Sequence, residues 1–323
     1  MIYQCGIIKI TSGKGRKLLS KSVDIIQRPK LGGHGKFVFR HGWFKKGYDL
    51  INQDPQGFFR EDAYIQLGVG KNMAESIRYW VQAVDILEEK RDEQRSFSPT
   101  RLGKAIFGES GFDPYLEQYD TLWLLHWQLS QNINRGLVYH IAFSKLYDNE
   151  FRKHNLIELL SKELPRYGVS TTEKMIERET DVFLRTYVPA RTKTKASIEE
   201  SLDCPLADLN LISFIQSDDV YRFRIGPKNT LSLKIFGYCF VKYIKEIAKN
   251  RRTTGIDEII YSAGSPGQIF KLDENSVMEY LENIEKLTNG AILLQETAGI
   301  RQIYLHNFNK LDEFRILEGE ELF

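Results

Sequence analysis

Two histidines lie in a short run at residues 32–46, GGHGKFVFRHGWFKK, which contains no carboxylate. Histidine is the side chain most often used for general acid–base chemistry near neutral pH, so His34 and His41 are weak candidates for catalysis. Neither has a partner at a spacing that would identify a catalytic pair. The run also carries the cations Lys36, Arg40, Lys45 and Lys46, for which we expect contacts with phosphate groups.

A structural role for the same run is open as well. Phe37 and Phe39 alternate as in a strand, and Trp43 and Phe44 suit a protein core. We therefore expect the aromatic residues to pack inward and the glycine-rich start, together with the cations, to bind an anion. The catalytic residues stay unknown at this point.

The sequence does not match the motifs of nucleotide-binding loops or zinc sites. The stretches SGKGRK and GVGKNM place glycine near lysine, but neither fits the phosphate-binding loop pattern, because Ile65 and Asn72 stand at two of its required positions in the second. Cys5, Cys204 and Cys239 are scattered, without the spacing of a zinc site. We expect no nucleotide, zinc or haem. Mg²⁺ or Mn²⁺ stays possible, since phosphodiester hydrolysis needs charge stabilisation.

A long amphipathic helix is predicted over residues 71–89 by apolar residues at helical spacing. A tight turn at residues 68–70 and a shorter helix over residues 59–69 precede it, and a charged hairpin follows. This order is typical of a winged helix-turn-helix. We expect DNA contacts from the open face of the helix and from the hairpin, by the side chains of Lys71, Asn72, Arg78, Tyr79, Gln82, Lys90, Arg91 and Arg95.

The remaining pattern is mainly α with small β-hairpins. Residues 155–188 and 256–305 repeat the order of helix, turn and helix, so we predict multiple winged helix-turn-helix-like units. We divide the chain into a basic N-terminal extension (1–31), a winged-helix DNA-binding domain (32–110), a helical middle domain ending in a basic linker (111–196) and a C-terminal α+β winged-helix-like domain (197–323).

The charge is unevenly distributed along the 323 residues, although the net charge is only +2. Residues 1–46 contain eleven Lys/Arg and one acid, so they carry about +10 and the remainder about −8. Such asymmetry favours a polyanionic partner, and a solvated flexible lead is the alternative. We expect no secretory signal and no membrane span, and the free cysteines suit the cytoplasm.

The chain resembles a bacterial family of uncharacterised-domain proteins whose members include SspB, the DNA-nicking component of the Ssp phosphorothioation defence system. The resemblance extends from about residue 32 to about residue 305. It is carried by the segments GHGKFVFRHGWFKKGYD, EDAYIQLGVGKNM, SIRYW, PTRLGKAIFG, DPYLE, TLWLLHW, CPLADLNLI, YRF, GSPGQIFKLDE and AGIRQIYL.

The resemblance implies a cytoplasmic DNA-binding protein of phage defence that nicks one strand so that sulfur can be inserted. It also implies double-stranded DNA and the sulfur-transfer modification proteins as partners, and no catalytic residue can be carried over. The alternative is a non-catalytic winged-helix adaptor or regulator that recruits those enzymes. Whether the protein is an enzyme, a metal-dependent nickase, stays open, and so does a possible homodimer.

Overall fold

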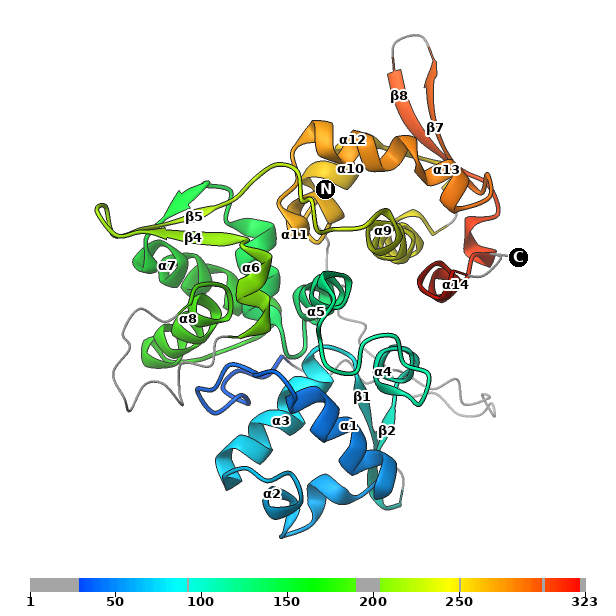
Figure 1. Ribbon diagram of the computed structural model, residues 1–323. Coiled ribbons are helices and arrows are strands. Elements are labelled where there is room, and N and C mark those ends of the chain that lie inside the picture. Colours follow the sequence, from blue (N-terminus) through cyan, green and yellow to red (C-terminus); the bar gives the residue numbers. More distant parts are fainter. Residues whose placement is uncertain (1–28, 92, 190–203, 250, 298–299, 320–323) are drawn as a thin grey trace, which may run out of the picture.

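The computed structural model describes residues 29–91, 93–189, 204–249, 251–297 and 300–319. Over these residues the protein is mainly helical with small antiparallel sheets, which confirms the predicted fold class at that level. Figure 1 shows three groups of elements around the central helix α5 (Tyr119–Gln131). Residues 121–130 of α5 are all buried, as expected of a helix that is apolar on every side.

The first group follows the order predicted for the first unit. It contains α1 (Trp43–Gln53), η1 (Gly57–Phe59), α2 (Ala63–Gln66), α3 (Lys71–Ala83), the antiparallel hairpin β1 (Leu87–Arg91) and β2 (Arg95–Pro99), and α4 (Arg101–Phe107). Helix α3 packs against α1 with Ile77 and Trp80 fully buried. The assignment of this group as a winged helix stays a prediction.

The predicted end of α3 is wrong. The helix ends at Ala83, and Leu87, which continues the helical spacing of apolar residues, lies in strand β1. The chain turns at Asp85, which has a positive φ of 59°, a conformation that aspartate tolerates better than most residues. The amide of Ile86 then donates to the carbonyl of Val81. The predicted helix before α3 is also shorter than expected, although Gly68 takes the left-handed conformation expected for the turn.

The second group contains α6 (Leu137–Lys145), α7 (Lys153–Glu163), η2 (Leu164–Tyr167), α8 (Glu173–Tyr187), η3 (Pro205–Leu209) and the sheet β3-β5-β4 (Glu150–Phe151, Val220–Phe223, Ile212–Ile215). Strand β3 pairs with β5, so this sheet joins the predicted middle and C-terminal segments. The domain boundaries stay predictions. The basic linker, residues 190–196, lies outside the described residues, as does the extension up to residue 28.

The third group contains α9 (Leu233–Ala248), α10 (Ile256–Tyr261), α11 (Pro266–Phe270), α12 (Glu274–Glu282), α13 (Ile284–Leu287), η4 (Phe308–Lys310), α14 (Glu313–Glu318) and the sheet β6-β8-β7 (Thr253–Gly255, Ile300–Leu305, Ile292–Thr297). Its core joins that of the other groups across α5. No helix within the described ranges is both long and apolar enough to cross a membrane.

Buried His126 on α5 is a core residue. Its Nδ1 lies 2.8 Å from the hydroxyl of Tyr187 on α8 and its Nε2 2.9 Å from the carbonyl of Ile269 on α11, so His126 connects the second and third groups of elements. Burial lowers the pKa of His126 to about 3. The imidazole is therefore neutral at physiological pH, and it serves packing rather than binding.

Gly103 fixes the hairpin against α4. A Cβ at this position would lie 2.2 Å from the carbonyl oxygen of Ile86, the residue just before β1. Helix propensity alone favours alanine over glycine by about 1 kcal/mol, whereas overpacking a rigid contact costs about 1–3 kcal/mol. We predict that Gly103→Ala lowers the free energy of unfolding in urea titrations, while the neighbouring exposed Lys104→Ala changes it little. A gain in stability for Gly103→Ala would contradict this packing.

Candidate nucleic-acid interface

A cleft of about 550 Å³ opens between α3, the β1–β2 hairpin, the loop before α1 and two residues of the second group. We call it the basic cleft, because five cations and two carboxylates line it. Its lining residues are Lys30, Leu31, Gly32, Gly33, Gly35, Phe59, Asn72, Glu75, Arg78, Tyr79, Gln82, Glu89, Arg95, Phe97, Arg135 and Arg178. Such an excess of positive charge in a concave surface attracts anions.

Helix α3 forms one wall of the basic cleft with the face opposite its buried residues. Asn72 and Glu75 are exposed and Arg78 is half-buried on this face. No ion pair joins Arg78 to any described carboxylate within 4.0 Å, so its guanidinium is available to a ligand. The sequence predicted this open face for Asn72 and Arg78. It also predicted Lys71, which instead lines the neighbouring hollow beside α2.

Tyr79 and Gln82 have their polar groups occupied by the protein itself. The predicted open position of Tyr79 is wrong, since its side chain is buried and its hydroxyl donates to the carbonyl of Arg135. Gln82 donates to the carbonyl of Arg78 at 2.7 Å and accepts from Arg135 Nη2 at 2.5 Å. Both residues therefore position Arg135. Burial lowers the pKa of Arg135, but an arginine stays protonated at physiological pH.

The hairpin contributes a stacked column of side chains. The rings of Phe97 and Phe59 stack with centroids 5.3 Å apart, and the Arg95 guanidinium carbon lies 4.7 Å from the Phe59 centroid. Arg95 also binds Glu89 at 2.5 Å, and Arg91 lies 3.8 Å from the same carboxylate. Because side chains alternate along a strand, Lys90 points to the opposite face and does not line the basic cleft.

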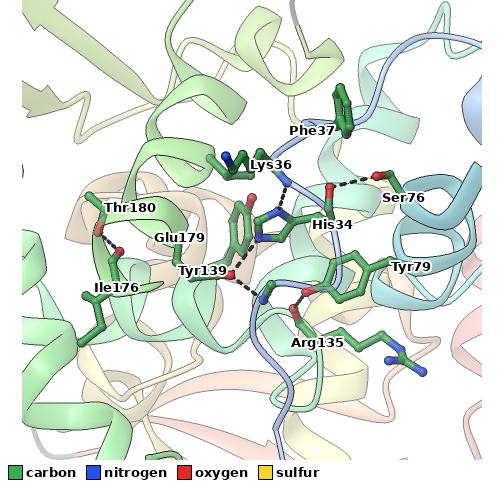
Figure 2. Close-up of polar contacts among 12 residues, drawn as sticks. His34, Lys36, Phe37, Ser76, Tyr79, Arg135, Tyr139, Ile176, Glu179 and Thr180 are labelled. Carbon is green, nitrogen blue, oxygen red and sulfur yellow. Dashed lines mark hydrogen bonds and ion pairs between the residues drawn. The ribbon is translucent and has the colours of Figure 1, made fainter. Parts of the chain in front are cut away.

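The loop over residues 30–36 closes the cleft against α8. The amide of Gly32 donates to Glu179 Oε1 at 2.6 Å, and His34 Nε2 lies 3.0 Å from the same oxygen (Figure 2). The amide of Lys36 donates to His34 Nδ1 at 3.3 Å, so the ring proton is on Nε2 and is donated to the carboxylate. We call Gly32, His34 and Glu179 the buried clip.

The glycines of this loop serve close packing. A Cβ at Gly33 would lie 2.4 Å from the ring of Tyr79, and Gly32 and Gly35 have φ of +77° and +58°. The amides of Gly32 and Gly35 are used inside the protein, by Glu179 and by the carbonyl of Gly32. The expectation that the glycine-rich start exposes these two N–H groups to an anion is therefore wrong.

The two histidines of the opening run do not line the basic cleft. His34 is only 1% exposed, beneath the basic cleft, with both ring nitrogens in hydrogen bonds. His41 is exposed but is not among the lining residues of the basic cleft or of its two neighbours. Neither histidine therefore lines the basic cleft or the hollows beside it.

The other cations of the opening run have local partners. Lys45 binds Asp49 at 2.5 Å, Lys46 donates to the carbonyl of Leu67 at 3.0 Å, and the Arg40 guanidinium lies 5.7 Å from the Trp43 ring centroid. Lys36 lines a second hollow, of about 440 Å³, which we call the α8 hollow. The residues lining it are Lys36, Thr172, Lys174, Met175, Glu177, Arg178, Asp181 and Arg185.

Sequence reasoning missed Lys30, Glu89, Arg135 and Arg178 of the cleft. Arg135 is the one cation in the short loop between the apolar helices α5 and α6, a placement that could have marked it. Arg178 lies on α8 and lines both the basic cleft and the α8 hollow. Its Nε is buried and has no hydrogen-bond partner among the described residues, which is a costly state that an anionic ligand would relieve.

A preformed metal site is not apparent in the described ranges, where no three His, Cys, Asp or Glu side chains gather closely enough to hold an ion. Glu75 and Glu89 are the carboxylates that line the basic cleft, and Glu89 is already bound by Arg95. The described residues therefore do not fit a protein-built metal cage.

The buried clip gives a stability prediction. Glu179→Ala removes the acceptor of the buried His34 ring and of the partly buried Gly32 amide, and an unsatisfied buried donor costs about 1–3 kcal/mol. We expect a lower midpoint of chemical denaturation and faster proteolysis near residue 32. Glu177→Ala, an exposed glutamate on the same helix, is the matched control and should behave as the unchanged protein. Equal stability of the two variants would mean that the clip does not hold the loop.

Comparisons with known proteins identify similar structures and a family. Two solved structures match, an SspB crystal structure at 26% identity and a magnesium ion-bound SspB crystal structure at 25% identity. In both cases the TM-score is 0.79, and the match covers 90% of this chain and 87% of the other. The curated proteins contain no match.

A family model covers nearly the whole chain. It spans residues 31–320, from the loop that carries the buried clip to the last described helix. Its description is that of a protein of unknown function, DUF4007. The structural likeness to SspB over 90% of the chain confirms the resemblance predicted from the sequence motifs. The chain belongs to the DUF4007 family.

Proposed function

We propose that the protein binds double-stranded DNA through the phosphates that reach the basic cleft and acts in a bacterial phosphorothioation defence system, as its likeness to SspB suggests. The observation that carries the proposal is the convergence of five cations from separate segments on one cleft with only two carboxylates. Arginine forks bind phosphate oxygens in pairs, and such contacts supply most of the affinity for nucleic acid.

The first group of elements serves as a winged helix in this proposal. Helix α3 is the recognition helix, with Asn72, Glu75 and Arg78 on its open face, and the β1–β2 hairpin is the wing. The same order of helices and hairpin recurs in the third group, with β6 pairing with β8. There the recognition position belongs to α12, which is rich in glutamate, so that unit suits a protein partner such as a sulfur-transfer modification enzyme, or a second copy of the chain.

The second candidate function is metal-dependent nicking of one DNA strand. The magnesium ion bound to the similar SspB favours it. In this candidate function, the residues of this chain bind and orient the DNA. Arg78, Arg135 and Arg178 hold a phosphodiester, and the β1–β2 hairpin limits its position. The described residues contain no preformed cage, so we derive no step through a metal ion.

Arg78→Ala tests DNA binding. We predict at least about a tenfold loss of affinity for duplex DNA, since a charged hydrogen bond contributes about 1.5–3 kcal/mol. The slope of log affinity against log salt should also fall by about one unit. Lys286→Ala, which removes an exposed cation on α13, is the control. Fluorescence anisotropy over a salt series measures both. If the Arg78 variant binds DNA with unchanged affinity, α3 does not belong to the DNA-binding surface.

A plasmid assay separates the two candidate functions. If the protein is a nickase, supercoiled plasmid relaxes in Mg²⁺ or Mn²⁺, and EDTA or Arg178→Ala abolishes the relaxation. If it is an adaptor, DNA binding falls steeply with salt while the plasmid stays supercoiled under every metal condition. Gel electrophoresis after incubation gives the answer directly, and relaxation that persists in EDTA would contradict the metal-dependent scheme.

A further inference from the structure

The basic cleft is a concave, half-open site. Its walls come from the loop at residues 30–35, α3, the hairpin, Arg135 and Arg178, and its volume of about 550 Å³ falls in the range of sites for small ligands, about 300–1,000 Å³. A paired duplex is recognised over a much larger surface, about 1,000–2,500 Å² of protein. A duplex can lie across the rim, and the volume of the cleft suits a single nucleotide.

The lining suits one nucleotide in its chemical detail. Arg78, Arg135 and Arg178 are guanidinium donors on the α3, interhelix and α8 sides of the cleft, where a phosphate would be held. On the hairpin side, the stacked column of Phe97 and Phe59 ends in Arg95, whose side chain is 62% exposed. Unpaired bases stack on arginine planes as well as on aromatic rings, so a base on Arg95 would extend the column.

Two neighbouring hollows indicate a strand rather than a free nucleotide. The α8 hollow shares Arg178 with the basic cleft and adds the cations Lys36, Lys174 and Arg185. The α2 hollow, of about 460 Å³ and lined by Phe58, Arg60, Glu61, Ala63, Tyr64, Lys71, Ala74, Glu75 and Arg78, shares Glu75 and Arg78 with it. A free nucleotide would fill only the cleft, whereas a strand places phosphates in all three positions.

From these observations we infer that the basic cleft binds one unpaired nucleotide of a DNA strand, with its phosphate on the arginines and its base on Arg95, and that the flanking phosphates occupy the α8 and α2 hollows. The inference rests on the proposed DNA-binding function and adds the state of the DNA: locally opened rather than fully paired. Opening a duplex costs least where bases are already mismatched, so mismatched DNA is the sensitive probe.

Anisotropy titrations with two duplexes of equal length and charge test the inference. One duplex is fully paired and the other has a short central stretch of mismatched bases. We expect the mismatched duplex to bind about tenfold or more tightly, because stacking of each unpaired base contributes about 1–3 kcal/mol. Arg95→Lys keeps the charge but not the stacking plane, so the ratio between the affinities for the mismatched and the paired duplex should fall to about one, whatever the change in affinity for the paired duplex.

The outcomes separate the inference from the function beneath it. Equal binding of the two duplexes, or a preference that survives in Arg95→Lys, overturns the inference and leaves DNA binding in place. If neither duplex binds in a salt-dependent manner, the proposed DNA-binding function itself is rejected. Two further experiments distinguish a strand from a free nucleotide. Lys174→Ala should lower the affinity of the protein for the mismatched duplex. The nucleotide dTMP should compete only weakly with that duplex for the protein. Competition by dTMP at the affinity of the mismatched duplex would also overturn the inference.

Discussion

The candidate interface depends on one buried carboxylate. Glu179 on α8 accepts from the amide of Gly32 and from His34, two residues almost 150 positions away in the sequence. This contact draws the loop before α1 onto the second group of elements (Figure 2). Residues of the loop then line one cleft together with α3 and Arg178. Removing water from a carboxylate is costly, and the two donors compensate for it. The buried clip thereby brings together segments that form a cleft only in combination.

A second set of contacts determines which side chains of α3 remain for a ligand. Tyr79 and Gln82 hold Arg135 by its backbone and its guanidinium, and their polar groups are then occupied. Arg78 and Arg178 form no ion pair within the described ranges, and the buried Nε of Arg178 lacks a partner. Positive side chains that line one cleft repel one another, so this arrangement lowers the stability of the fold. The negative charge of a bound phosphate would offset this repulsion, which is the physical basis of the proposed function.

Local patterns predicted the elements better than the site. The start of α3, the turn at Gly68 and the charged hairpin follow from glycine placement and periodicity, whereas the end of α3 does not, because Leu87 keeps the helical spacing from within a strand. Asn72, Arg78 and Arg95 could be found from the pattern of one unit. The loop position of Arg135 offered a hint, but the proximity of Lys30, Arg135 and Arg178 could not be predicted. That proximity is created by the buried clip and by packing around α5, which no local spacing records.

Hydrogen–deuterium exchange with and without DNA tests the central claim, that DNA phosphates occupy the basic cleft. The account predicts slower exchange on binding at residues 30–36, along the β1–β2 hairpin and in the part of α8 around Arg178, with α12 and the β7–β8 hairpin unchanged as an internal reference. Protection confined to the third group of elements, with unaltered exchange around the buried clip, would contradict the account.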